Sequence, residues 1–351
     1  MLKKSLALFM LVMFTSFNAL KADEGMWLPM LIKRLNYADM QKHGLQLTAD
    51  EIYSVNNSSL KDAIVALNGG SCTAETISEK GLLLTNHHCA FGVIQDNSAP
   101  EHDYLMDGFW AMAMKEELNA RGMTASYLIE MRDVTSDLLT EISITLSGEE
   151  RQKAVSEATK AIQEKISGEV AEHYDVKIKE FYEGNEYYAF VYETYRDVRL
   201  VGAPPSSIGK YGGDTDNWMW PRHTGDFSFY RAYVGKDGKP ADFSEDNVPY
   251  QPKSFLKVSG SGVAEGDFVM VTGYPGRTNR YRTAIEVENQ FQWTYPNSLE
   301  LREKLMEIIK QTAAEGGDAR IKYESTLAGL ANYAKNFTSM IELSRHQETV
   351  S

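Results

Sequence analysis

The chain of 351 residues contains only two cysteines, Cys72 and Cys89, and none of the spacings typical of a metal-binding motif. It has no CxxC, HxxxH or HExxH sequence, and most of its histidines are scattered. Two cysteines are too few for a disulfide-rich scaffold or for a four-cysteine zinc site. His87, His88 and Cys89 are adjacent, but neighbours on an extended chain point to opposite faces and make a poor ligand set. We therefore expect no metal and no cofactor.

Positive charge and long apolar runs are scarce as well. The chain has 36 Lys and Arg residues against 49 Asp and Glu, a net charge of −13 at pH 7, which disfavours nucleic acid and anionic membranes as partners. Beyond residue 22 no stretch is long and apolar enough to span a bilayer. Within 1–22, an apolar run follows Lys3 and Lys4 and ends at Ala22. This pattern predicts a signal peptide, and hence an exported protein, periplasmic, surface-bound or secreted, that starts at Asp23.

The state of the two cysteines depends on where the chain folds. Because an exported chain meets an oxidising compartment, we expect Cys72 and Cys89 to form a disulfide. The two residues are 17 positions apart, and closing a loop of that size stabilises a fold by about 3 kcal/mol in the chain-entropy model. Two unpaired buried thiols are the alternative.

The pattern of apolar residues is strand-like over much of the chain. Thr48 and Glu51 fit a capping box, which predicts a short helix over about 49–67. Alternating apolar residues then predict three strand-rich blocks, at 73–86, 176–195 and 225–278. The first two blocks contain turn residues between their strands, so each is expected to form a hairpin.

Helical patterns occupy two other regions. Spacings of three and four between apolar residues predict an amphipathic helix at about 147–172, and residues 284–349 have a helical pattern throughout. The sequence therefore predicts a β-rich domain at 23–280 with a helical insertion, followed by the beginning of an α-helical domain at 281–351. A chain of this length with 43% hydrophobic residues can bury more than one core.

The sequence LLLTNHHCA, residues 82–90, places His88 directly before Cys89 at the end of an apolar run. Its Thr-x-x-His-Cys element resembles that of the chymotrypsin-like serine peptidases, in which the histidine is the general base and a disulfide holds it in place. A histidine base works near neutral pH but needs a carboxylate to fix its tautomer. The residues alone allow a buried core histidine equally well.

Asp226 is the candidate carboxylate. It precedes a run containing Phe227, Phe229 and Tyr230, in a position that resembles the aspartate of the same peptidases, although a lone carboxylate there is more typical of a cap or turn. The sequence GDFVMVTGYPG, 266–276, resembles a strand that follows the aspartate and precedes the serine in bacterial trypsin-like proteases. The three elements in this order imply a mainly β, chymotrypsin-like barrel, the N-terminal half of a two-barrel peptidase.

Longer motifs narrow the resemblance. TNHHC, DYLMDGFWA, DNWMWPRHTGDFS and GYPGRTNRY together resemble the dipeptidyl-peptidase 7/11 family of bacterial serine exopeptidases, and the likeness runs from DEGMWLP to the last residue. Members of that family are exported and release dipeptides from peptide N-termini. They have a two-barrel catalytic domain with a large helical domain inserted between the barrels. The resemblance therefore implies peptide substrates, and we expect a homodimer in the full-length form.

The resemblance also assigns roles to five residues. It carries His88 over as general base and Asp226 as its orienting partner. It further implies that Asn217, Trp218 and Asn332 hold the α-ammonium group of the substrate. Amide oxygens and an aromatic face suit a cation, although without the resemblance the tryptophan would be assigned to core packing and the second asparagine to a helix surface.

The serine nucleophile of such enzymes has no counterpart in this sequence. In these peptidases a Gly-Asn/Asp-Ser-Gly-type turn supplies both the nucleophile and the oxyanion hole, and no such turn occurs here. We therefore expect an N-terminal portion of a longer enzyme that is inactive alone and whose side-chain preference is set elsewhere. One alternative is a non-catalytic peptide-binding or regulatory module. Another is a complete endopeptidase that uses Ser228 or Ser261.

Overall fold

The computed structural model describes residues 26–140, 142–276, 282–314 and 317–350. The predicted signal peptide at 1–22 and the predicted domain boundary near 280 lie outside these residues. In the described part of the chain, no helix combines the length and the apolar composition that crossing a membrane requires.

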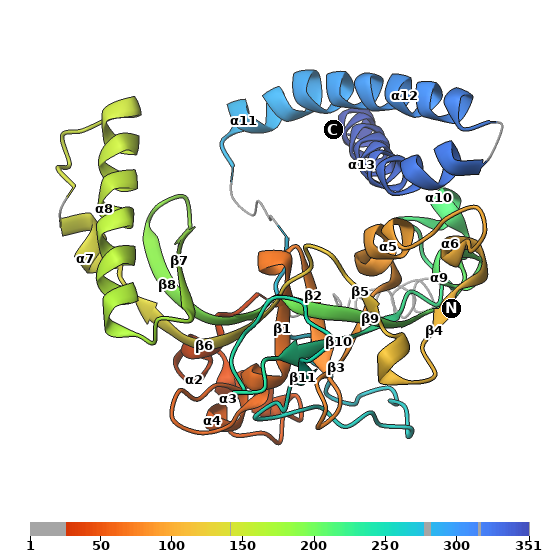
Figure 1. Ribbon diagram of the computed structural model, residues 1–351. Coiled ribbons are helices and arrows are strands. Elements are labelled where there is room, and N and C mark those ends of the chain that lie inside the picture. The colour runs from red at the N-terminus through yellow and green to blue at the C-terminus, as the bar shows by residue number, and fades with distance from the viewer. Residues whose placement is uncertain (1–25, 141, 277–281, 315–316, 351) are drawn as a thin grey trace, which may run out of the picture.

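Eleven strands of the described residues form one antiparallel sheet (Figure 1). Their order is β4-β9-β10-β3-β2-β1-β6-β8-β7, with β11 paired to β10 and β5 paired to β9. The strands are β1 Ile64–Leu67, β2 Cys72–Thr76, β3 Leu82–Thr85, β4 Phe109–Trp110, β5 Leu118–Asn119, β6 Ala125–Asp133, β7 Tyr174–Phe181, β8 Glu186–Tyr195, β9 Asp197–Ala203, β10 Ser228–Val234 and β11 Val248–Pro249.

The two predicted hairpins are confirmed. β2 pairs with β3, and β7 pairs with β8, each pair antiparallel. The alternation in the third block is confirmed for β10, where Ser228 and Tyr230 are buried and Phe229 is partly exposed. β10 also pairs with β3, so the sheet brings the residues just before β10 beside the residues just after β3. This register places the candidate histidine and carboxylate together.

The predicted helix at 49–67 is wrong over most of its length. The capping box of Thr48 and Glu51 forms, but α4 (Ala49–Ile52) is a single turn. The chain then bends through two asparagines and two serines and enters β1, whose four residues, IVAL, are all buried. Burial between two neighbouring strands outweighs the helical pattern here, because Ile and Val pack well on a pleated surface.

The strands predicted between 251 and 276 are absent from the described residues. The segment is irregular, and the side chains of Val258, Val263, Val269 and Val271 are exposed. It makes an isolated backbone contact with β2, from Leu256 N to Thr76 O. Alternation predicts a strand only where a neighbouring strand can supply hydrogen bonds, and no described strand pairs with this segment.

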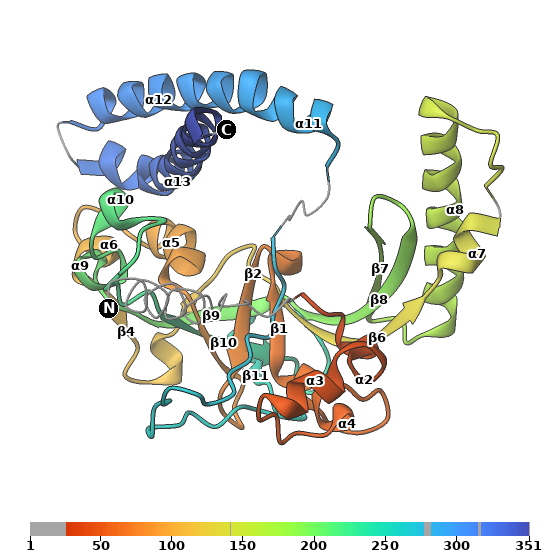
Figure 2. The ribbon, with the colours of Figure 1, turned by 180° about the vertical axis from the view of Figure 1, so that it is seen from behind.

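The helical predictions after residue 282 are confirmed, as is the helix predicted near 147–172. Figure 1 shows α8 beside β7 and β8 at one end of the sheet, and α12 and α13 on the opposite side of the sheet from α2, α3 and α4, an arrangement seen also from behind in Figure 2. The α-helices are α2 Ile32–Leu35, α3 Tyr37–Lys42, α4, α5 His87–Asp96, α6 Tyr104–Asp107, α7 Thr135–Thr140, α8 Gly148–Glu169, α9 Ser206–Gly209, α10 Gly213–Asp216, α11 Ala284–Asn289, α12 Tyr295–Thr312 and α13 Gly317–Val350, and a π-helix, Gln290–Thr294, joins α11 to α12.

Helix α13 joins the helical layer to the sheet. It packs against both α12 and α5, and its Ile321 belongs to the main hydrophobic core. Polar contacts continue this attachment: Arg320 pairs with Asp103, and the backbone N–H of Ser325 donates to Gln95 Oε1 at 2.7 Å. These contacts hold one face of α13 against α5, the helix at whose beginning the candidate site lies.

Candidate active site

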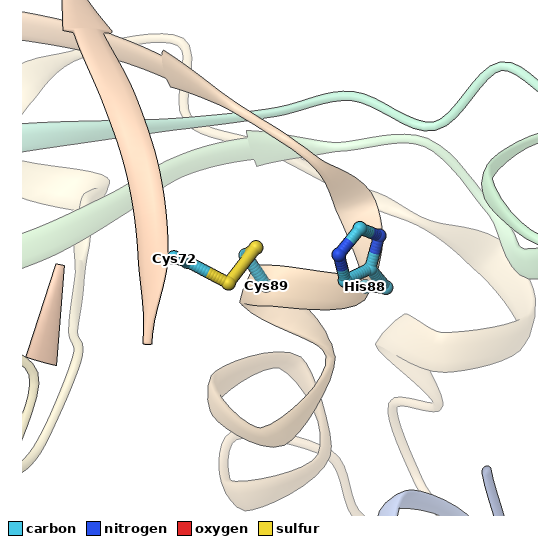
Figure 3. Close-up of side chains that lie close together, drawn as sticks. All are labelled: Cys72, His88 and Cys89. Atoms are coloured by element: carbon cyan, nitrogen blue, oxygen red, sulfur yellow. A yellow bond between two sulfur atoms is a disulfide. The ribbon is translucent and has the colours of Figure 1, made fainter. Parts of the chain in front are cut away.

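The predicted disulfide between Cys72 and Cys89 is confirmed. The expectation that His87, His88 and Cys89 lie on an extended chain is wrong, because these residues form the first turn of α5. The disulfide joins Cys72, the first residue of β2, to Cys89 in the first turn of α5, with the two Cα atoms 6.1 Å apart. Figure 3 shows this bridge next to His88. Possible donor atoms of Cys72, His88 and Cys89 all lie within 4.8 Å of one another, but the two sulfurs are bonded to each other and are not thiolate ligands. The bridge instead ties the first turn of α5, which carries His88, to β2.

His88 and Asp226 contact each other directly. His88 Nδ1 lies 2.8 Å from Asp226 Oδ2, and the backbone N–H of His88 donates to Asp226 Oδ1 at 3.0 Å. The His88 side chain is 70% exposed, whereas that of Asp226 is 21% exposed. Because the carboxylate faces Nδ1, the ring can donate from that nitrogen and keep Nε2 as an acceptor. The two candidate residues, 138 positions apart, are thus joined by two hydrogen-bond contacts.

The charge state of Asp226 follows from its surroundings. Partial burial by itself would raise the pKa of this carboxyl, but hydrogen bonds from the ring and the backbone N–H of His88 lower it, and the net result is a pKa below the ordinary value. The carboxylate also lies at the N-terminal end of α5, where the exposed N–H groups favour a negative charge. Asp226 is therefore ionised at neutral pH.

His87 points into the core. Its side chain is 1% exposed, its ring meets that of Phe91 edge-on at 5.7 Å, and a Cβ built on Gly209 would lie 2.4 Å from it. Burial lowers the pKa of His87 to about 4, with Asp226 raising it and His88 and Lys210 lowering it further. Neither ring nitrogen has a hydrogen-bond partner among the described residues. His87 is consequently neutral at physiological pH and turned away from the site.

The buried His87 predicts a loss of stability in mild acid. Between the folded pKa of about 4 and an ordinary value of about 6.5, the unfolded chain binds more protons than the folded chain. Stability should therefore fall by about 3 kcal/mol as the pH drops through this window. The contribution of Asp226, whose pKa is lowered, is lost only at still lower pH.

Urea denaturation at several pH values would test this expectation. The His87→Gln variant does not titrate, so its free energy of unfolding should vary less between pH 6.5 and 4. An identical pH dependence in both proteins would contradict the assignment to His87.

Asn217, Trp218 and Asn332 form a second polar group. Asn217 Nδ2 donates to Asn332 Oδ1 at 2.8 Å, and Trp218 Nε1 donates to the backbone oxygen of Asn332 at 3.2 Å. The first two residues follow α10, whereas Asn332 lies on α13. Trp218 is 57% exposed and has a φ of 62°, a conformation that a bulky residue adopts rarely. The alternative that Trp218 packs in the core is wrong.

Sequence reasoning missed two residues of these groups. Arg222 Nη1 donates to Asn217 Oδ1 at 3.0 Å, although the sequence suggests no role for it. Asn86 Nδ2 lies 3.2 Å from both the backbone oxygen and Oδ2 of Asp226. The position of Asn86 directly before a helix could have drawn attention to it, but α5 is not predicted from the sequence. An asparagine at such a position would in any case normally be read as a helix cap.

The two candidate serines differ in their surroundings. Ser228 is fully buried on β10, and its Oγ has no hydrogen-bond partner within the described residues. Ser261 lies exposed in the irregular segment. Of the hydrogen bonds that the described residues make, none joins a serine hydroxyl to the ring of His88. Among the described residues, the ring of His88 thus has no serine hydroxyl as a partner.

Comparisons with known proteins agree on one family. The model of the family Peptidase S46 matches residues 22–351. Dipeptidyl-peptidase 7 of Capnocytophaga gingivalis is 49% identical, with 93% of this chain and 45% of the relative covered. The Asp/Glu-specific dipeptidyl-peptidase of Flavobacterium psychrophilum is 45% identical, with 95% and 46% covered.

Solved structures give the same result. The crystal structure of Porphyromonas endodontalis DPP11 in complex with the dipeptide Arg-Asp matches with a TM-score of 0.85 and 41% identity, over 93% of this chain and 47% of that one. The chain thus spans about half the length of the relatives that it matches. With a family model that matches nearly all of its residues, the chain belongs to the Peptidase S46 family.

Proposed function

We propose that this chain supplies the general base and the amine-binding residues of an exported serine-type dipeptidyl peptidase. The observation that carries the proposal is the 2.8 Å contact between His88 Nδ1 and Asp226 Oδ2, beside a disulfide that anchors the helix bearing the base. Relatives named dipeptidyl-peptidase 7 and Asp/Glu-specific dipeptidyl-peptidase support it. The nucleophilic serine belongs to a part of the enzyme outside this sequence, so this chain alone is inactive.

In the proposed reaction His88 moves one proton. Its Nε2 takes the proton of the serine hydroxyl as the oxygen attacks the scissile carbonyl, and the imidazolium then gives that proton to the leaving amine. Asp226 remains ionised throughout. It holds the Nδ1–H tautomer beforehand and stabilises the imidazolium while it exists.

The second polar group is proposed to bind the α-ammonium of the peptide. Asn217 Oδ1 accepts one hydrogen bond from Arg222, and Asn332 Oδ1 accepts one from Asn217. A carbonyl oxygen has two lone pairs, so each amide can accept a further hydrogen bond from the ammonium. The exposed face of Trp218 adds a favourable site for a cation. Because the amine is held at a fixed distance from the catalytic residues, that distance sets how many residues lie between the N-terminus and the bond that is cleaved.

We further propose that the eleven-stranded sheet is one half of a two-barrel, chymotrypsin-like catalytic domain. The support comes from the irregular segment 251–276. The side chains of its valines are exposed, that of Val271 completely. Its amino-acid sequence alternates between apolar and other residues, as in a strand. Strands of a second barrel would supply the missing hydrogen bonds and cover these side chains.

The products of the full-length enzyme test the proposed function. Incubated with a hexapeptide, the enzyme should release dipeptides in sequence from the free N-terminus, detectable by mass spectrometry. The same peptide with an acetylated N-terminus should be cleaved at least about 100-fold more slowly, because the charged hydrogen-bond donor is lost. Cleavage at internal bonds, or equal rates for the two peptides, would contradict the proposal.

A further inference from the structure

Asn86 stands at the N-cap position of α5 but does not cap the helix. Its backbone is extended, with φ −76° and ψ 151°, and its side chain accepts no hydrogen bond from the first turn. An asparagine at this position ordinarily accepts a backbone N–H two or three residues further on. In this chain Asp226 Oδ1 accepts the N–H of His88 instead, at 3.0 Å. A carboxylate from the segment before β10 thus accepts one backbone N–H of the helix terminus.

The amide of Asn86 is therefore available for another task. Its Nδ2 lies 3.2 Å from the backbone oxygen of Asp226 and 3.2 Å from Oδ2 of the same residue. Both of these atoms are acceptors, so the group facing them is the NH₂ end of the amide. Because the NH₂ group of Asn86 contacts both the backbone oxygen and the carboxylate of Asp226, it restricts rotation of the Asp226 side chain.

The contacts of Asn86 converge on the oxygen that faces the base. Asp226 Oδ2 contacts both Asn86 Nδ2 and His88 Nδ1, while Oδ1 accepts a hydrogen bond from the backbone N–H of His88. A carboxylate that rotated would turn Oδ2 away from the ring, and the preference of His88 for the Nδ1–H tautomer would weaken. Burial of Asp226 is only partial, so packing alone does not fix its orientation.

We propose that Asn86 is a positioning residue for the peptidase reaction, one that holds the Asp226 carboxylate in the orientation that keeps His88 in its Nδ1–H form. The inference rests on the proposed function of His88 and Asp226. Asn86 touches no reacting atom, and its effect passes through the carboxylate to the ring.

The tautomer of His88 can be measured in the 351-residue chain itself. Two-bond ¹H–¹⁵N correlation spectra of ¹⁵N-histidine-labelled protein at pH 8 distinguish Nδ1–H from Nε2–H imidazole. The spectrum of the His88→Gln variant, which lacks one of the seven histidines, identifies the signals of His88. In the wild type we expect His88 to be mainly Nδ1–H. In Asn86→Ala the ratio of Nδ1–H to Nε2–H should fall about five- to tenfold, the effect of losing one hydrogen bond.

The Asn86→Ser variant separates positioning from capping. Serine caps helices as well as asparagine does, but its side chain is too short to reach Asp226 Oδ2. We expect Asn86→Ser to keep the melting temperature of the wild type and still to show the five- to tenfold change in tautomer ratio. A serine variant with the wild-type ratio would overturn the inference, because the contact between Asn86 and Asp226 would then have no effect on the tautomer.

The spectrum of the wild type separates a failure of the inference about Asn86 from a failure of the proposed function. If wild-type His88 is mainly Nε2–H, the proposed base and orienter pair fails, and the inference fails with it. If the wild type is mainly Nδ1–H and neither variant changes the ratio, only the role of Asn86 is overturned. If Asn86→Ala does not fold, Asn86→Ser decides the question.

Discussion

His88→Ala should lower the kcat/KM of the full-length enzyme by about 10⁴- to 10⁶-fold, whereas His87→Ala should lower it by less than about 100-fold. The difference follows from where the two rings lie. His88 presents an exposed ring with Nδ1 on Asp226, so in the proposed reaction its removal leaves the nucleophile without a base. His87 is buried and neutral, and its removal leaves a cavity behind the site.

The stability of the two variants provides the control. His87→Ala should lower the free energy of unfolding by about 2–4 kcal/mol, the usual cost of a cavity in the core, while His88→Ala should leave it almost unchanged. Initial rates with a chromogenic dipeptide substrate and urea denaturation of each variant measure both quantities. An equal loss of activity from the two substitutions in folded protein would leave the choice of His88 unsupported.

Asp226→Asn should lower kcat by about 10⁴-fold with little change in KM. The amide has the size of the carboxylate, but its NH₂ group can donate to Nδ1 and so favour the Nε2–H tautomer, which cannot accept the proton of the nucleophile. The loss therefore comes from the wrong tautomer. Steady-state kinetics at pH 7 to 8 measure the two parameters separately.

Asp246→Asn is the matched control for Asp226→Asn. Its carboxylate is exposed and pairs with Lys236 on the surface, where an ion pair contributes little. Activity within about twofold of the wild type is expected for this variant. A similar loss from both substitutions would indicate a general effect of charge rather than an orienting carboxylate.

The sequence allowed the pairing of His88 with Asp226 to be predicted because several local signals agreed. The hairpin β2–β3 follows from alternation and a turn, the disulfide follows from two cysteines in a chain predicted to be exported, and β10 follows from an alternating run. The register of β10 on β3 then brings the two side chains together. That register is a tertiary feature that no pattern in the sequence predicts, and the resemblance to a family implied only that the two side chains act together.

Other features could not be predicted from local patterns. Asn217 and Asn332 meet across 115 positions, and nothing in the residues around either of them indicates the other. Asn86 has the sequence position of a helix cap, but a carboxylate from the distant segment before β10 takes that role. The alternation in 251–276 failed as a predictor because a strand needs a neighbour, which periodicity does not report.

A double-mutant cycle in the full-length enzyme tests most directly the claim that His88 and Asp226 act as one unit. The four proteins are the wild type, His88→Ala, Asp226→Asn and the double variant, compared by kcat. The account predicts that the double variant is no slower than His88→Ala alone, because a carboxylate that acts through the ring has no effect once the ring is gone. Losses that multiply, to about 10⁸-fold or more, would contradict it.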